Sequence, residues 1–193
     1  DLGTAATKAD FSGVVQRIKT KNHALKEITI TANMGDGDDL VIASAGKMVI
    51  DGGTGNNAVD YSQLSKDFSL TISAENNTKN HYHVEKQANQ TQVLEESIFE
   101  KQINYGKNKE KVQYRDALIT TSACKSIDTL SHVQTIKASK GNDIMKGSSW
   151  DDDFHGDDGN DTIKTGAGND IAYGGKGHDH IEMGAGADLA HQD

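Results

Sequence analysis

The chain has 193 residues, of which 34% are hydrophobic and 5% aromatic, and its formal net charge is −9. Because this composition cannot build a large apolar core, we expect an all-β fold that bound ligands help to stabilise. The single cysteine, Cys124, excludes an internal disulfide framework, and the acidic charge argues against nucleic-acid binding. No run of about twenty apolar residues and no apolar leader occurs, so we expect neither a spanning helix nor a cleaved N-terminal signal.

Sequence patterns divide the chain into four predicted segments. In order, these are a β-rich lead-in, a short repeat block, a β-rich connecting segment and a long repeat array, at residues 1–33, 34–60, 61–137 and 138–193. In the lead-in, residues 27–31 alternate polar and apolar side chains, which is the pattern of a half-buried strand.

The short block contains three nine-residue units. Asp39 in the first unit and Asn57 in the third stand eighteen residues apart, and Met48 takes the equivalent place in the middle unit. Carboxylate and amide oxygens suit a hard cation, whereas a thioether does not. We therefore expect one metal site at most in this block, at Gly37, Asp39 and Asn57, and none beside Met48.

The connecting segment has weaker signals. Residues 68–72 alternate like a strand, and so do residues 112–114, whereas Ile98 and Phe99 fit a helix face equally well. We assign the segment as β-rich. Two imidazoles, at His81 and His83, share one side of a predicted strand and could hold a transition metal, but the sequence places no third ligand nearby, so a surface pair is the simpler interpretation.

The long array holds six unbroken nine-residue units. An aspartate occupies the same place in every unit, as Asp143, Asp152, Asp161, Asp170, Asp179 and Asp188. Five of these have a glycine two residues earlier, as Gly141, Gly159, Gly168, Gly177 and Gly186. We assign all of these residues to metal-binding turns, because carboxylates and turn carbonyls form an oxygen cage suited to calcium.

Each unit is predicted to form a six-residue turn and a three-residue strand with one inward apolar residue. The inward positions are Met145, Phe154, Ile163, Ala172, Ile181 and Ala190. Two units make one turn of a right-handed parallel β-roll, so residues eighteen apart stack. Residues 138–193 carry eleven Asp and one Glu against four Lys, which is −8 of the total charge of −9, so we expect this segment to be disordered in a chelator.

Two patterns carry a family resemblance. Residues 174–182 read G-G-x-G-x-D-x-U-x, the calcium-binding repeat of RTX proteins. The connecting segment contains Gly-Lys-x-x-Glu-x-x-Gln-Tyr-Arg, at Gly106, Lys107, Glu110, Gln113, Tyr114 and Arg115. The order of short block, lysine motif and long array resembles the RTX pore-forming cytolysins, which include haemolysins, leukotoxins and the adenylate cyclase-haemolysin. The resemblance implies that Lys107 receives an amide-linked fatty acyl chain from a dedicated acyltransferase.

The resemblance also implies a location and partners. It implies type I secretion without a cleaved N-terminal signal, calcium-driven folding outside the cell, and action at a target-cell membrane, with a surface receptor as a further partner. Asn108 departs from the family, in which arginine commonly follows the acylated lysine. The family's amino-terminal pore-forming region and carboxy-terminal secretion signal are not in the sequence, so we expect the chain to be a fragment of a virulence-associated toxin.

An alternative from another class is a calcium-binding RTX module of a secreted adhesin or enzyme, without acylation. Both interpretations predict calcium binding, so only modification of Lys107 separates them. The sequence contains no nucleophile elbow, zinc-protease helix motif or phosphate-binding loop, and we do not expect the chain itself to be an enzyme.

Overall fold

The computed structural model describes residues 8–10, 29–75, 78–88, 97–105, 108–116 and 125–192. In these ranges every regular element is a strand, and no helix could cross a membrane. One sheet of the described chain has seven strands, in the order β1 (Lys8–Asp10), β3 (Leu40–Ile42), β5 (Ala58–Asp60), β11 (Thr135–Lys137), β13 (Asp153–His155), β15 (Ile171–Tyr173) and β17 (Leu189–His191).

The second sheet of the described chain has eight strands. Their order is β16 (His180–Glu182), β14 (Thr162–Lys164), β12 (Ile144–Lys146), β6 (Phe68–Ala74), β7 (His81–Ala88), β10 (Lys125–Ser131), β4 (Lys47–Asp51) and β2 (Thr29–Asn33). Strands β8 (Ser97–Tyr105) and β9 (Asn108–Asp116) pair only with each other, as an antiparallel hairpin. The prediction of strands near residues 27–31, 68–72 and 112–114 agrees with β2, β6 and β9, and Ile98 and Phe99 lie in a strand.

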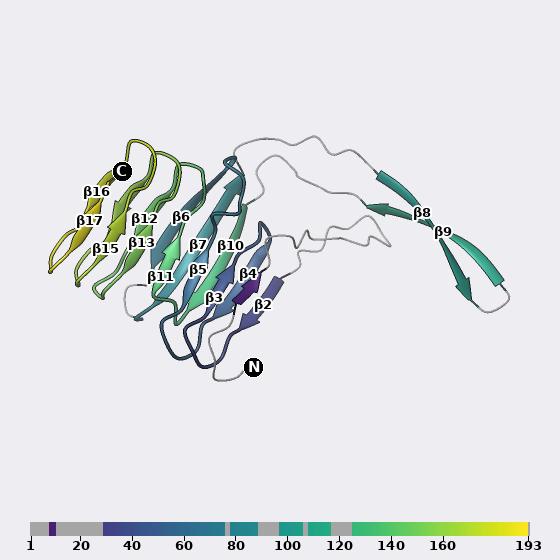
Figure 1. The fold of residues 1–193 in the computed structure, drawn as a ribbon, viewed down its shortest axis with the longest axis horizontal. Helices are drawn as coiled ribbons and strands as arrows, with labels where there is room; N and C mark the ends of the chain where they lie inside the picture. The colour runs from purple at the N-terminus through teal and green to yellow at the C-terminus, as the bar shows by residue number, and fades with distance from the viewer. Residues whose placement is uncertain are drawn as a thin grey trace.

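Successive strands of the repeat units alternate between the two sheets, which confirms the all-β parallel β-roll (Figure 1). The register is eighteen residues: Ile144 lies opposite Thr162, and Asp153 lies opposite Ile171. One strand in each sheet, with its turn, therefore makes one coil of the roll. The six-residue turns follow from the glycines, whose positive φ angles L side chains rarely adopt.

The short block and the long array, which the sequence divides into separate segments, belong to one roll. In one sheet β5 of the block pairs with β11, which pairs with β13 of the array. In the other sheet β6, β7 and β10 fill the space between β4 and β12 (Figure 1). Strand β7 is antiparallel to both of its neighbours, so the connecting segment adds a local antiparallel patch to a parallel sheet.

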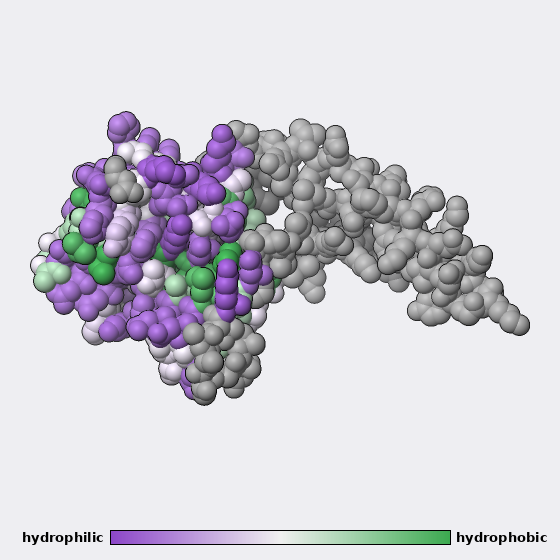
Figure 2. Space-filling view, viewed as in Figure 1, coloured by the Kyte–Doolittle hydropathy of each residue, from purple (hydrophilic) through white to green (hydrophobic). Residues whose placement is uncertain are grey.

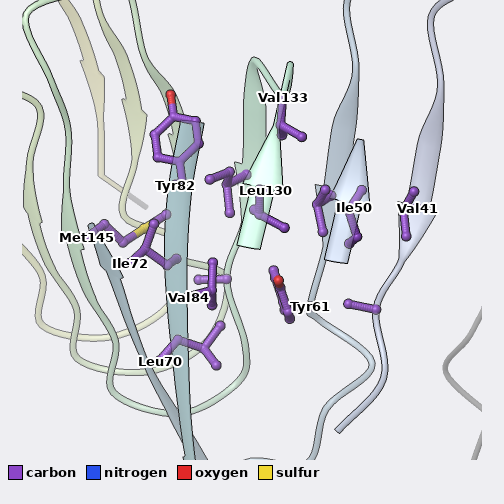
Figure 3. Packing of buried hydrophobic residues seen from close by; sticks show 14 of the residues in the cluster. Val41, Ile50, Tyr61, Leu70, Ile72, Tyr82, Val84, Leu130, Val133 and Met145 are labelled. Atoms are coloured by element: carbon purple, nitrogen blue, oxygen red, sulfur yellow. The ribbon is translucent and has the colours of Figure 1, made fainter. Parts of the chain in front are cut away.

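The connecting segment, residues 61–137, supplies many of the residues of the hydrophobic core. Figure 3 shows Tyr61, Leu70, Tyr82, Val84 and Leu130 pointing into the space between the sheets, and all five are buried. Apolar side chains turned inward leave the face seen in Figure 2 mostly hydrophilic. The strands of the connecting segment thus contribute apolar surface that nine-residue units alone could not supply.

Towards the C-terminal coils the core becomes thin. Four of the six predicted inward residues are fully buried, namely Met145, Phe154, Ile163 and Ala172. Ile181 is partly buried and packs against the core, as predicted, whereas Ala190 is exposed, so the prediction is wrong for Ala190 alone. The reason is that a coil is covered by the coil above it, and no described coil follows β17.

Candidate calcium-binding turns

The repeat aspartates form two ladders, one on each edge of the roll. On one edge the backbone N–H of Asp143 donates to Oδ1 of Asp161 at 2.8 Å, and that of Asp161 donates to Oδ1 of Asp179 at 2.9 Å. On the other edge the N–H of Asp152 donates to Oδ1 of Asp170 at 2.9 Å, and Asp170 repeats this with Asp188 at 3.1 Å. Each aspartate therefore bridges to the coil before it.

The short block continues the edge that contains Asp152 and Asp170, but here amide side chains accept the hydrogen bonds in place of carboxylates. The N–H of Asp39 donates to Oδ1 of Asn57 at 3.0 Å, and Nδ2 of Asn57 donates to the carbonyl of His132. The N–H of Asn57 in turn donates to Oε1 of Gln134 at 2.6 Å. Gln134 was not among the predicted site residues, although it stands eighteen residues before Asp152 and the period could have revealed it.

The first aspartates of the long array have hydrogen-bond donors on both carboxylate oxygens. Asp143 accepts from the N–H groups of Leu70 and Ser139 and from the Ser139 hydroxyl. Asp152 accepts from the hydroxyl of Tyr82, and from the N–H and hydroxyl of Ser148. The two serines stand nine residues apart, each four residues before its aspartate. Protein groups therefore supply hydrogen-bond donors to all four carboxylate oxygens of these two aspartates.

The next two aspartates are different. Oδ2 of Asp161 and Oδ2 of Asp170 are buried and have no hydrogen-bond partner. Burial raises the pKa of Asp161 to about 8, and the nearby carboxylates of Asp143 and Asp179 add to this effect. A buried carboxylate oxygen without a donor is costly unless a cation neutralises it. The residues present therefore fit a hard divalent cation at these turns, and calcium would supply the missing positive charge.

Turn carbonyls must supply the other ligands. Within the described ranges, no three acidic, histidine or cysteine side chains lie close enough to hold a metal ion together. Glycines let the carbonyls of successive turns stack: a Cβ on Gly177 would lie 1.7 Å from the carbonyl oxygen of Gly159, and one on Gly186 would lie 1.6 Å from that of Gly168. Equivalent approaches join Gly159 to Gly141, and Gly55 to Gly37.

Replacing Asp161 with asparagine is expected to weaken calcium binding at its edge by at least about tenfold, because a charged ligand becomes neutral. The fold should survive, since Asn57 already takes the same ladder position with an amide oxygen. Calorimetric titration with calcium would measure the change. Asp158→Asn is the matched control, because it removes an equal charge from an exposed pair with Lys176. Equal calcium affinities in the two variants would contradict this assignment of Asp161.

Two other predicted sites lie apart from the turns. On β7, His83 pairs with Glu75 at 2.9 Å, and the ring of His81 hydrogen-bonds to the carbonyl of Lys79. These contacts give each imidazole a partner other than a shared metal. Lys107 lies outside the described residues, between β8 and β9 in the sequence, and Cys124 also lies outside them.

Comparison with known proteins places these turns in a family. The family model of the RTX calcium-binding nonapeptide repeat matches residues 35–62, 133–163 and 155–190. The chain is similar to leukotoxin of Aggregatibacter actinomycetemcomitans, with 36% identity over 66% of this chain and 12% of the relative. It is also similar to chromosomal hemolysin of Escherichia coli, with 35% identity over 66% of this chain and 13% of the relative.

A third relative is cytolysin RtxA of Kingella kingae, with 34% identity over 75% of this chain and 16% of the relative. The matched stretch thus spans less than a fifth of the length of each of these three relatives. RTX nonapeptide repeats bind calcium, in agreement with the buried carboxylates of the turns. The chain therefore belongs to the RTX toxin family, through a stretch that carries its calcium-binding repeats.

Proposed function

We propose that the chain is the calcium-binding and membrane-engaging part of a secreted RTX pore-forming cytolysin, and that it has no catalytic activity of its own. The observation that carries this proposal is the pair of aspartate ladders, in which Asp161 and Asp170 each keep a buried carboxylate oxygen without a protein partner. Calcium sites in extracellular modules have dissociation constants on the order of 10⁻⁴ to 10⁻³ M. Such turns stay empty in a cytosol and fill outside the cell.

The calcium concentration is lower in the cytosol than outside the cell, and this difference would favour export over return. The C-terminal coils, which lack their calcium in the cytosol, would enter a type I secretion channel as an unfolded chain. Outside the cell, calcium neutralises the buried carboxylates and folds the coils. The partners in this proposal are therefore a type I secretion system and, at the destination, a target-cell membrane with or without a surface receptor.

We assign acylation to Lys107. The motif around it matches the cytolysin acylation pattern at Gly106, Glu110 and Gln113, and the relatives include a hemolysin and a cytolysin. The Lys107 Nζ amine would attack a fatty acyl thioester, in a transfer catalysed by a lysine acyltransferase; the amide forms as the thioester bond breaks, and the free thiol leaves with the proton from the amine. Burying an acyl chain in a membrane gains roughly 0.8 kcal/mol per CH₂, and one chain alone binds only marginally. Acylation would thus favour first contact with a membrane.

Co-expression of this chain with a cytolysin acyltransferase is expected to add a fatty acyl mass to the peptide that contains Lys107. Peptide mass spectrometry would locate the modification. In the Lys107→Arg variant this mass should be absent, and Lys109→Arg is the matched control that should keep it.

An unmodified Lys107, beside an acyltransferase shown to be active on a known toxin, would refute the assignment. The remaining candidate would then be a calcium-binding RTX module of a secreted adhesin or enzyme. That candidate shares the calcium turns and differs only in lacking the lipid.

A further inference from the structure

A buried lysine contacts the turn of the middle unit of the short block, residues 43–51. Lys86 lies on β7 and its side chain is 0% exposed. Its Nζ donates to the carbonyl oxygen of Ser44 at 2.9 Å, to Oδ2 of Asp128 at 2.8 Å, and to the carbonyl oxygen of Gly46. Two turn carbonyls and one carboxylate are the kinds of oxygen that surround calcium in this family of turns.

The carboxylate comes from a distant part of the chain but takes the ladder position. Met48 stands nine residues after Asp39, and its N–H donates to Oδ1 of Asp128 at 2.7 Å. This is the bond that Asp143 makes to Asp161 at 2.8 Å in the long array. It arises because β10 runs parallel to β4 (Figure 1), in a register that places Thr129 opposite Val49. Asp128 thus replaces the aspartate that the repeat would place eighteen residues after Met48.

The hydrogen bonds identify the charge state of the pair. An ammonium has three N–H donors and no acceptor, and the three groups bonded to the Lys86 Nζ are all acceptors. Asp128 receives donors only, from the Met48 N–H, the Tyr61 hydroxyl at 2.8 Å and Lys86. Burial lowers the pKa of Lys86 and raises that of Asp128, and the charge of each group offsets part of the shift of the other. The contacts are those of an ammonium and a carboxylate.

We propose that the turn of residues 43–51 is a cation site whose occupant is the chain's own Lys86 ammonium, in place of a divalent metal ion. The site has the ladder bond, the turn carbonyls and the carboxylate of a calcium turn, and its cation is covalently attached. This part of the roll therefore closes without calcium, and it offers a folded edge on which the calcium-dependent coils assemble. The proposal rests on the contacts of Lys86 and Asp128, and it requires neither acylation nor secretion.

Hydrogen exchange of the Met48 amide, in calcium and in a chelator, tests the proposal on the whole chain. In the unmodified protein its protection should agree within about threefold between the two conditions, because the occupant cannot be chelated. In Lys86→Ala, protection should fall at least about 100-fold in the chelator and return in millimolar calcium, which takes the place of the ammonium. Lys79→Ala removes an exposed lysine that stands just before the same strand, β7, and should behave like the unmodified protein.

The double variant Lys86→Met with Asp128→Asn provides a second measurement. It removes both charges, so Met48 should be protected in both conditions and calcium should add nothing. Three results would overturn the proposal: loss of Met48 protection by the unmodified protein in chelator, full protection of Lys86→Ala in chelator, or failure of calcium to restore that variant. The amide of His180 reports on the downstream turns in the same samples, so a failure of calcium binding there is seen separately.

Discussion

Removal of calcium with a chelator is expected to unfold the coils after residue 155 and to leave the earlier coils folded, a shorter segment than the 138–193 expected from the charge alone. The carboxylates of Asp161 and Asp170 each have a buried oxygen without a partner, and leaving a buried polar atom unsatisfied costs about 1–3 kcal/mol, more when it is charged. Apolar burial offsets little of this cost, because the units that contain these two aspartates each place one inward residue in the core, Ile163 and Ala172. Asp143 and Asp152 have protein donors on both oxygens.

Hydrogen exchange followed residue by residue would measure this boundary. The amides of His180 and Leu189, which bond to the carbonyls of Asp161 and Asp170, should lose at least about 100-fold in protection. The amide of Ala58, which bonds to the carbonyl of Asp39, should keep its protection. Loss of protection along the whole roll would show that the first coil of the array also requires calcium. Unchanged protection everywhere would show that the roll folds without calcium.

Replacing Gly177 with valine is expected to destabilise the coil that contains it by about 2–3 kcal/mol, a roughly 30- to 150-fold loss of protection at His180. Two causes act together. Gly177 has a φ of +141°, which L residues rarely adopt, and its Cβ would lie 1.7 Å from the carbonyl oxygen of Gly159. Because that oxygen belongs to backbone, a rotamer change cannot relieve the clash. Exchange in saturating calcium would measure the loss.

The neighbouring substitution His178→Ala serves as the matched control. His178 is exposed, and the hydrogen bond it makes to the side chain of Asn160 comes from its backbone N–H, which alanine keeps. This variant should therefore retain the protection of the unmodified protein. If Gly177→Val and His178→Ala were equally stable, close stacking of the turns would not be what requires glycine there.

The repeat units were predictable because their partners lie at a constant distance in the sequence. A strand such as β14 pairs with residues eighteen before and eighteen after it, so the nine-residue period alone gives the turns, the strands and the stacked aspartates. The same period also predicts the buried positions of Met145 and Ile163. It overestimates the burial of Ala190, because the period describes an endless roll and burial depends on a following coil.

The buried ion pair of Lys86 and Asp128 was harder to predict from the sequence. Lys86 follows Tyr82 and Val84 at every second residue of β7, and Asp128 precedes Leu130 in the same way on β10, so strand alternation places both charges inward. Alternation does not reveal that the two side chains meet. A buried charge is stable only beside its partner, and the partner of Lys86 is 42 residues away.

By itself the sequence determined the parallel β-roll, its eighteen-residue register and the residue types of the calcium turns, because each unit bonds to neighbours at fixed offsets. Only the tertiary structure decided that both repeat blocks form one roll, and which carboxylates have protein donors. The Leu70 and Tyr82 donors lie 73 and 70 residues from Asp143 and Asp152. Such contacts exist only after β6, β7 and β10 have paired between the blocks, and no local period encodes that pairing.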